Sequence, residues 1–200
     1  DITFYMIPDE GHNVENVWVD NFRVGNVSQY VFENVSAPHQ LEARFRINDY
    51  ELYITTSGEG SGTITPAGQV FGLLLVPWDT TITFTIDPSP GSYLVDVIVD
   101  DTLHLGVAYS YTIPNIRENH TIEAVFSLED YVVQTLVGAN GTMSPQGPLH
   151  YHYDDNQIFN IHANTGYWID TLYVDGVVCD SATHQTDFVY LLDTIRGNHL

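Results

Sequence analysis

Histidines and aspartates gather in one stretch of the chain, LHYHYDDNQIFNIHANTG, which runs from Leu149 to Gly166. His150 and His152 are two residues apart, so on a β-strand they point to the same face, where two imidazoles can chelate a transition metal. His162, Asp154 and Asp155 are further ligand types nearby. A structural zinc site needs four well-placed ligands, however, and a similar stretch earlier in the chain has the apolar Leu73–Val76 at the corresponding place. We therefore favour an exposed strand face over a metal site.

Two pairs of adjacent carboxylates offer another kind of chemistry, and they are Asp100 with Asp101 and Asp154 with Asp155. Neighbouring residues on a strand point to opposite faces, whereas a glycosidase needs two carboxylates that face one cleft. Turn positions suit these residues better. Calcium binds turn carboxylates and backbone carbonyls in loose geometry, so the four aspartates are candidate calcium ligands, although the spacing of an EF-hand is absent.

Nucleophilic catalysis finds no support. The single cysteine, Cys179, stands in GVVCDSATH without a base placed to activate it, and a small apolar filler is the simpler interpretation. We expect no catalytic residue and no enzyme. Trp18, Trp78 and Trp168 could form a platform for sugars, and a carbohydrate-binding module that contacts surface glycans is the alternative function. Against it, Trp18 aligns with Ile98 and Tyr173 in the repeats described below, so this position requires bulk more than indole.

The charge of the chain excludes several partners. The chain has 26 acidic residues, five arginines and no lysine, which gives a formal net charge of -21. Nucleic acids require clustered cations, so we expect no nucleic-acid binding. The most apolar stretch, Val70–Trp78, is far shorter than the roughly 20 residues of a membrane-spanning helix, so we expect no membrane insertion.

The elements that position these residues come from an internal repeat. Three stretches align without gaps: NVWVDN at Asn16–Asn21, DVIVDD at Asp96–Asp101 and TLYVDG at Thr171–Gly176. A glycine precedes each of them and a tyrosine follows, and these residues are Gly11, Gly91 and Gly166, then Tyr30, Tyr111 and Tyr190. The glycines and the strand-ending aspartates are expected to form turns.

The front of the repeat occurs only twice. Asp49–Gly68 matches Asp130–Gly147, and both contain the pattern G-T-[IM]-x-P. The back, HQLEARF in one copy and HTIEAVF in the next, is reduced to His199 and Leu200 in the last. The predicted domains are therefore residues 1–48, which lack their N-terminal strands, residues 49–129, which are complete, and residues 130–200, which lack their last strand.

The predicted fold is all-β. Segments such as TITFTI and TIEAVF alternate with period two, and glycine-rich stretches such as GEGSG and GANG are typical of hairpin connections. Long segments of helical period are absent. We expect tandem small β-sandwich or β-roll repeats of about 80 residues with no substantial helix.

This pattern resembles a known family. The run GSGTITPAG…TITFTIDPSPGSYLVDVIVDD…YTIPNIRENHTIEAVF is similar to the divergent internalin-type B-repeat, and Pro38 departs from it where the second copy has Asn119. Such repeats occur in tandem on large secreted and cell-surface proteins of bacteria, many of them Bacteroidota. The resemblance implies an extracellular spacer, adhesin or filament module without a known active site.

The functional hypothesis is a non-enzymatic, extracellular structural repeat protein at the bacterial cell surface. It serves as a stalk or a filament-forming segment. Because the end copies lack strands, we expect them to be completed by strand addition from adjoining chain or from neighbouring copies. Glycosylation is a further expectation, at the sequons of Asn26, Asn34, Asn119 and Asn140 or at the Asp-[Ser/Thr]-apolar triplets that begin at Asp101, Asp170, Asp180 and Asp193.

Overall fold

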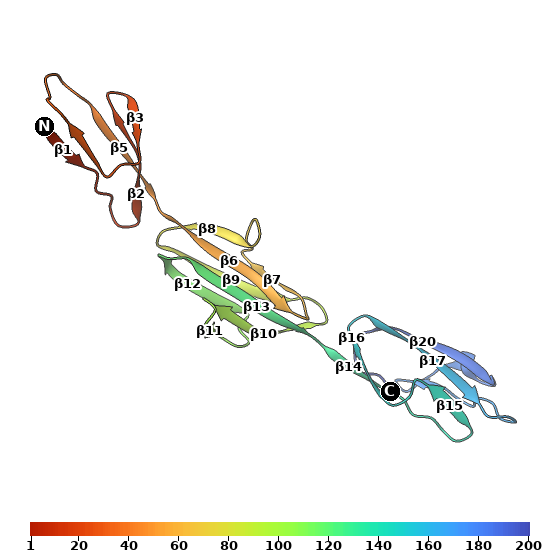
Figure 1. Cartoon of the computed structure of the whole chain (residues 1–200). Coiled ribbons are helices and arrows are strands. Elements are labelled where there is room, and N and C mark those ends of the chain that lie inside the picture. The colour runs from red at the N-terminus through yellow and green to blue at the C-terminus, as the bar shows by residue number, and fades with distance from the viewer. The chain divides into compact units, whose positions relative to one another are not determined.

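The computed structural model describes all 200 residues and is all-β, as the alternating pattern predicts (Figure 1). Its single helical element is the 3₁₀ turn η1, Asp180–Ala182. The chain contains no helix of the length and apolar character that a bilayer crossing demands. The residue ranges 1–48, 49–129 and 130–200 are called the first, central and third segments below.

The first segment has two antiparallel sheets, one of order β1-β4 and one of order β3-β2-β5. Its strands are β1 (Ile2–Tyr5), β2 (His12–Val19), β3 (Phe22–Gly25), β4 (Gln29–Phe32) and β5 (Leu41–Ile47). Met6, Val14 and Val17 form the buried core, whereas Phe45 on β5 stays 44% exposed.

The central segment contains eight strands: β6 (Asp49–Gly58), β7 (Gly62–Thr65), β8 (Leu73–Pro77), β9 (Thr80–Pro88), β10 (Ser92–Val99), β11 (Leu103–His104), β12 (Ser110–Ile116) and β13 (His120–Leu128). They form a five-stranded sheet of order β11-β10-β13-β6-β8 and a three-stranded sheet of order β12-β9-β7. Phe126 on β13 is 1% exposed. Phe45 corresponds to Phe126 in the aligned sequences, and of the two side chains Phe126 is far better covered.

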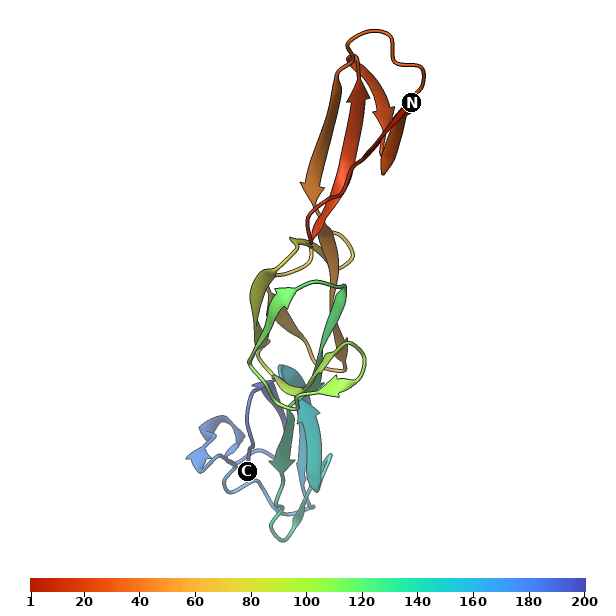
Figure 2. The same cartoon turned by 90° about the vertical axis from the view of Figure 1, so that its left-hand side faces the viewer.

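The third segment has strands β14 (Asp130–Gln134), β15 (Gly141–Ser144), β16 (Pro148–His152), β17 (Asp155–Ala163), β18 (Tyr173–Val174), β19 (Val177–Val178) and β20 (Asp187–Ile195). They form sheets of order β14-β16, β15-β17-β20 and β18-β19. The residues around β18 and β19 loop out to one side of the other strands in Figure 2. Val133, Phe159, Leu192 and Ile195 are the buried core.

Local sequence explains these elements. In β9 the alternation places Phe84 and Ile86 on the buried face, each 0% exposed, while the alternating Thr83 and Thr85 face outward. The turns follow from residues that tolerate positive φ. Asp20, Asp100 and Asp175 end their strands at φ of 49°, 51° and 50°, a conformation that Asp and Asn adopt more readily than most residues.

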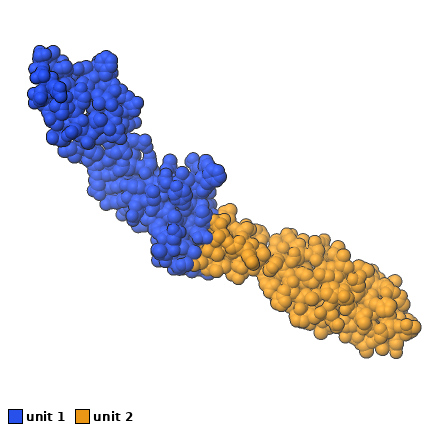
Figure 3. All heavy atoms as spheres, viewed as in Figure 1, with its two compact units in different colours: residues 1–55, 64–86, 97–123 blue, residues 56–63, 87–96, 124–200 orange.

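By its internal contacts the chain divides into two compact units (Figure 3). One consists of residues 1–55, 64–86 and 97–123, and the other of residues 56–63, 87–96 and 124–200. The division falls inside the range 49–129 and coincides with neither predicted domain boundary. The three-copy organisation therefore stays a prediction from the sequence.

Candidate functional sites: aspartate–histidine clasps and glycine–aromatic joints

Each segment contains the same pair of side chains, which we call the clasp. The aspartate that ends a strand faces a histidine that follows it in the chain, with Oδ2 and Nδ1 2.7 Å apart in Asp20–His39, 2.9 Å in Asp100–His120 and 2.6 Å in Asp175–His199. The other carboxylate oxygen accepts the backbone N–H of the residue after the histidine, which is Gln40, Thr121 or Leu200. The clasp thus fixes the start of the chain stretch that follows each histidine.

Backbone hydrogen bonds complete the clasp. The aspartate N–H donates to the carbonyl of the same following residue, at 2.9 Å for Asp20 to Gln40 and 2.6 Å for Asp175 to Leu200. Hydrogen bonding from His39 and from the Gln40 amide lowers the pKa of Asp20. Hydrogen bonding from the Leu200 amide, and secondly from His199, lowers the pKa of Asp175 in the same way. These carboxylates are structural acceptors, held in the charged form.

A glycine and an aromatic ring meet where the first segment contacts the central one, and we call this the first joint. A β-carbon added at Gly11 would lie 2.2 Å from Cδ2 of Trp78, so the indole occupies the space that a side chain at this position would need. Asn48 ties both sides together, because its N–H donates to the Gly11 carbonyl and its carbonyl accepts the Trp78 N–H, each at 2.8 Å. Only glycine permits this approach, and its φ of +73° also suits glycine.

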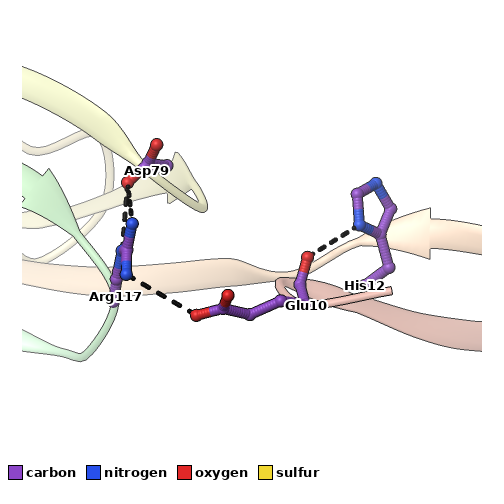
Figure 4. Close-up of polar contacts among 4 residues, drawn as sticks. All are labelled: Glu10, His12, Asp79 and Arg117. Carbon is purple, nitrogen blue, oxygen red and sulfur yellow. Dashed lines mark hydrogen bonds and ion pairs between the residues drawn. The ribbon is translucent and has the colours of Figure 1, made fainter. Parts of the chain in front are cut away.

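At the first joint Arg117 lies between the carboxylates of Asp79 and Glu10 (Figure 4). Its guanidinium lies 4.7 Å from the centre of the Trp78 ring and donates to Oδ1 of Asp79, at 3.0 Å from Nε and 2.9 Å from Nη2. On the other side Nη1 lies 3.5 Å from Oε1 of Glu10, which belongs to the first segment. The Glu10 carbonyl in turn lies 3.1 Å from Nδ1 of His12. The arginine therefore links both sides of the joint.

The second joint, between the central and third segments, repeats this arrangement. A β-carbon at Gly91 would lie 2.1 Å from Cβ and 2.4 Å from Cγ of Tyr153. Glu129 donates its N–H to the Gly91 carbonyl at 2.8 Å. Arg196 lies 5.2 Å from the centre of the Tyr153 ring and donates from Nε to Asp154 at 2.6 Å, which raises the pKa of Arg196. Gly166, the aligned glycine of the third segment, has no atom within 4 Å of an added β-carbon.

The four candidate calcium ligands lie in two separate pairs, one pair in each compact unit. Asp100 is engaged in its clasp and Asp101 lies 3.5 Å from the Thr121 hydroxyl. Asp154 accepts from Arg196, and Asp155 accepts the His152 N–H at 2.7 Å. The two pairs form no common cluster, and no group of three or more metal-ligating side chains occurs in the chain. Calcium binding stays a prediction, and at three of these carboxylates an ion would compete with strong protein donors.

The candidate ligands of the histidine-rich stretch, residues 149–166, are also divided between separate sheets. Nδ1 of His150 lies 2.6 Å from Asp130, and Nδ1 of His162 lies 2.6 Å from Asp187. The two histidines belong to different sheets, β16 pairing with β14 and β17 with β15 and β20. His152 instead lies 3.3 Å from the carbonyl of Glu129.

The candidate glycosylation positions are all exposed, whereas the three tryptophans differ from one another. The four sequon asparagines and the aspartates that begin the four triplets are exposed. Of the tryptophans, Trp18 and Trp78 lie under arginines, whereas Trp168 is 59% exposed and packs only against His184 among the aromatic contacts.

Sequence reasoning identified the aspartates and glycines as turn residues but not their partners. The clasp could have been found, because a histidine recurs with the aspartate in every copy, 19, 20 and 24 residues later. The joints carry a weaker signal, since a glycine and an aromatic residue far apart in sequence meet there only through the fold.

No family model, curated protein or solved structure matches this chain. The likeness to the internalin-type B-repeat therefore stays a prediction.

Proposed function

We propose that this protein is a non-enzymatic, extracellular structural repeat protein of the bacterial cell surface. It acts as a spacer, adhesin stalk or filament-forming segment, and its end segments are completed by adjoining chain or by a neighbouring subunit. Its work is mechanical, because each segment transmits force and orientation to the next through a packed joint.

The recurrence of the glycine–aromatic joint is the observation that carries this proposal. Gly11 meets Trp78 and Gly91 meets Tyr153, and in each case an arginine covers the ring and an aspartate holds the arginine. Flexible linkers are typically rich in Gly and Ser. Here the residues between segments, Asn48 and Glu129, are fixed by backbone hydrogen bonds, which favours a spacer of defined geometry.

The joint predicts a measurable stiffness. Spin labels at Val24 and Leu103, both exposed and both in the first compact unit, report the distance across the first joint, with Cys179 replaced by serine to avoid labelling there. Double electron–electron resonance should give one narrow distance distribution, and the Trp78→Ala variant a broader one. A broad distribution in the unaltered protein would contradict a spacer of fixed geometry.

Assembly is tested separately, by sedimentation velocity over a range of protein concentrations. Association that grows with concentration supports the filament-forming role. A stable monomer at every concentration removes that role and leaves the spacer.

The alternative function, carbohydrate binding, has one observation in its favour. Tyr167, Trp168 and Tyr173 are exposed by 51%, 59% and 59%, and all three belong to the third segment. Exposed rings can stack on sugars, so a glycan array with the Trp168→Ala variant as control separates the two functions. Binding that disappears in this variant would favour the carbohydrate module.

A further inference from the structure

The third segment contains an open apolar groove beside β14. The cavity has a volume of about 660 Å³, and its lining includes Val133, Leu136, Met143, Phe159, Tyr190 and Leu200. All of these residues belong to one compact unit.

One edge of the groove is the free edge of strand β14, and His199 already pairs with that edge. His199 forms a parallel bridge with Val133, accepts the Gln134 N–H at 2.9 Å and donates to the Val132 carbonyl at 3.0 Å. The Asn198 side chain accepts the Val132 N–H. In the central segment Asn119 accepts the Glu51 N–H in the same manner. There the chain continues from His120 as β13, which lies between β10 and β6.

The strands beside the groove are shortened. β6 has ten residues, whereas β14, its counterpart by sequence, has five and ends at Gln134, next to the last paired residue. β10 has eight residues, whereas its counterpart β18 has two. Both differences lie where β13 would supply the neighbouring strand.

We propose that this groove is an acceptor site for one extended polypeptide strand that is supplied from outside residues 1–200 and runs parallel to β14. This deepens the proposed function, on which it rests, by naming the site and the chemistry of its occupant. The incoming strand continues the pairing that His199 begins. Its first paired residue donates to the Gln134 carbonyl and accepts the Leu136 N–H, because parallel ladders advance two residues at a time.

The inner face of the occupant follows from β13. Ile122, Ala124 and Phe126 are 1%, 0% and 1% exposed, so the groove takes a strand that is apolar at alternate positions, with a small residue between two large ones. The clasp of Asp175 and His199 already holds Leu200 at the place where the incoming strand would begin.

The test adds a peptide to the intact protein. The probe is the acetylated peptide IEAVFSLED, which copies Ile122–Asp130. We expect saturable binding with a Kd below about 1 mM, together with shifted amide signals at Gln134 and Leu136 and slower hydrogen exchange at Leu136. The control peptide NEAVNSLED lacks the two large inner side chains and should bind at least about tenfold more weakly, because each buried large apolar side chain contributes more than one factor of ten.

Two variants of the protein locate the strand. Leu136→Pro removes the backbone N–H with which the incoming strand would pair. Leu136 is 74% exposed and lies outside β14, so the segment should still fold. It should weaken binding by about fivefold to tenfold, the usual worth of one hydrogen bond. Leu136→Ala loses the same leucine side chain but keeps the N–H, so the fivefold to tenfold difference is measured between these two variants.

Three outcomes overturn the proposal: no binding of IEAVFSLED, equal binding of both peptides, or equal binding by both Leu136 variants. Self-association that IEAVFSLED does not inhibit would likewise show that a surface other than this groove joins the copies. The proposed function and the acceptor groove can fail separately. If the peptide binds but the first joint is flexible, the groove is supported and the spacer role is refuted.

Discussion

Substituting the joint glycines tests whether the segments are packed or merely tethered. Gly11, Gly91 and Gly166 all have positive φ, at +73°, +76° and +86°, so alanine pays a similar backbone cost at each position. That cost is about 1–2 kcal/mol for a left-handed conformation. Only the first two positions contact a ring, so Gly166→Ala is the matched control for Gly11→Ala and Gly91→Ala.

The difference between the variants measures the joint. At Gly11 a β-carbon would lie 2.2 Å from the indole, so Trp78 must move. Overpacking of this kind costs about 1–3 kcal/mol. We expect Gly11→Ala to lower the free energy of opening at the joint by about 2–5 kcal/mol in all, and Gly166→Ala to lower the stability around its own turn by about 1–2 kcal/mol.

Native-state hydrogen exchange is the appropriate assay, because a chain of several segments need not unfold in one step. The amides of Asn48 and Trp78 form hydrogen bonds across the first joint, so their protection should fall in Gly11→Ala. The double variant Gly11→Ala/Trp78→Ala should show a coupling energy of about 1–3 kcal/mol, since the second change removes the clash. Equal losses of stability in Gly11→Ala and Gly166→Ala would refute the packed joint.

Three further changes test the core, the clasp and the arginine. Phe126→Ala should cost about 3–5 kcal/mol in urea denaturation, and Phe45→Ala about 1–2 kcal/mol because that ring is 44% exposed. The folded-state pKa of Asp175 is lowered, so its contribution to stability is present above the unfolded pKa near 3.8 and is lost as the pH falls through the lower folded value. Asp175→Asn should therefore be less stable than the unaltered protein at pH 7, and thermal melts should show this difference shrink as the pH falls below 3.8. Arg117→Gln should reduce the protection of the joint amides by about 1 kcal/mol, the scale of an exposed cation–π contact with surface ion pairs. The reduction should be smaller at 1 M salt, which screens the charges. Unchanged protection would show that the ring alone holds the joint.

The all-β fold could be predicted because its signals are local. The alternation in TITFTI places Phe84 and Ile86 inside without reference to any other part of the chain. The turn aspartates could be predicted for the same reason, and their positive φ confirms that they end strands. These conclusions needed only the chemistry of neighbouring residues.

The joints could not be predicted, because their partners are set by the fold. Gly11 reads as an ordinary turn residue, and nothing near it in sequence indicates that Trp78 will lie against it. Exposure differs in the same way between Phe45 and Phe126, which are equivalent by sequence. β13, which carries Phe126, has a strand on each side, β10 and β6, whereas β5, which carries Phe45, is an edge strand beside β2 alone.

The placement of the arginines connects the acidity of the chain with its joints. Twenty-six acidic residues and no lysine give every segment a negative surface, so two segments brought into contact repel each other. Of the five arginines, Arg117 lies in the first joint, Arg196 lies over the ring of the second, and Arg46 holds Asp49 at 2.5 Å where the first segment passes into the central one. Scattered cations would serve solubility equally well. Three of the five arginines therefore lie at or next to the contacts, where their positive charge offsets the repulsion between acidic segments.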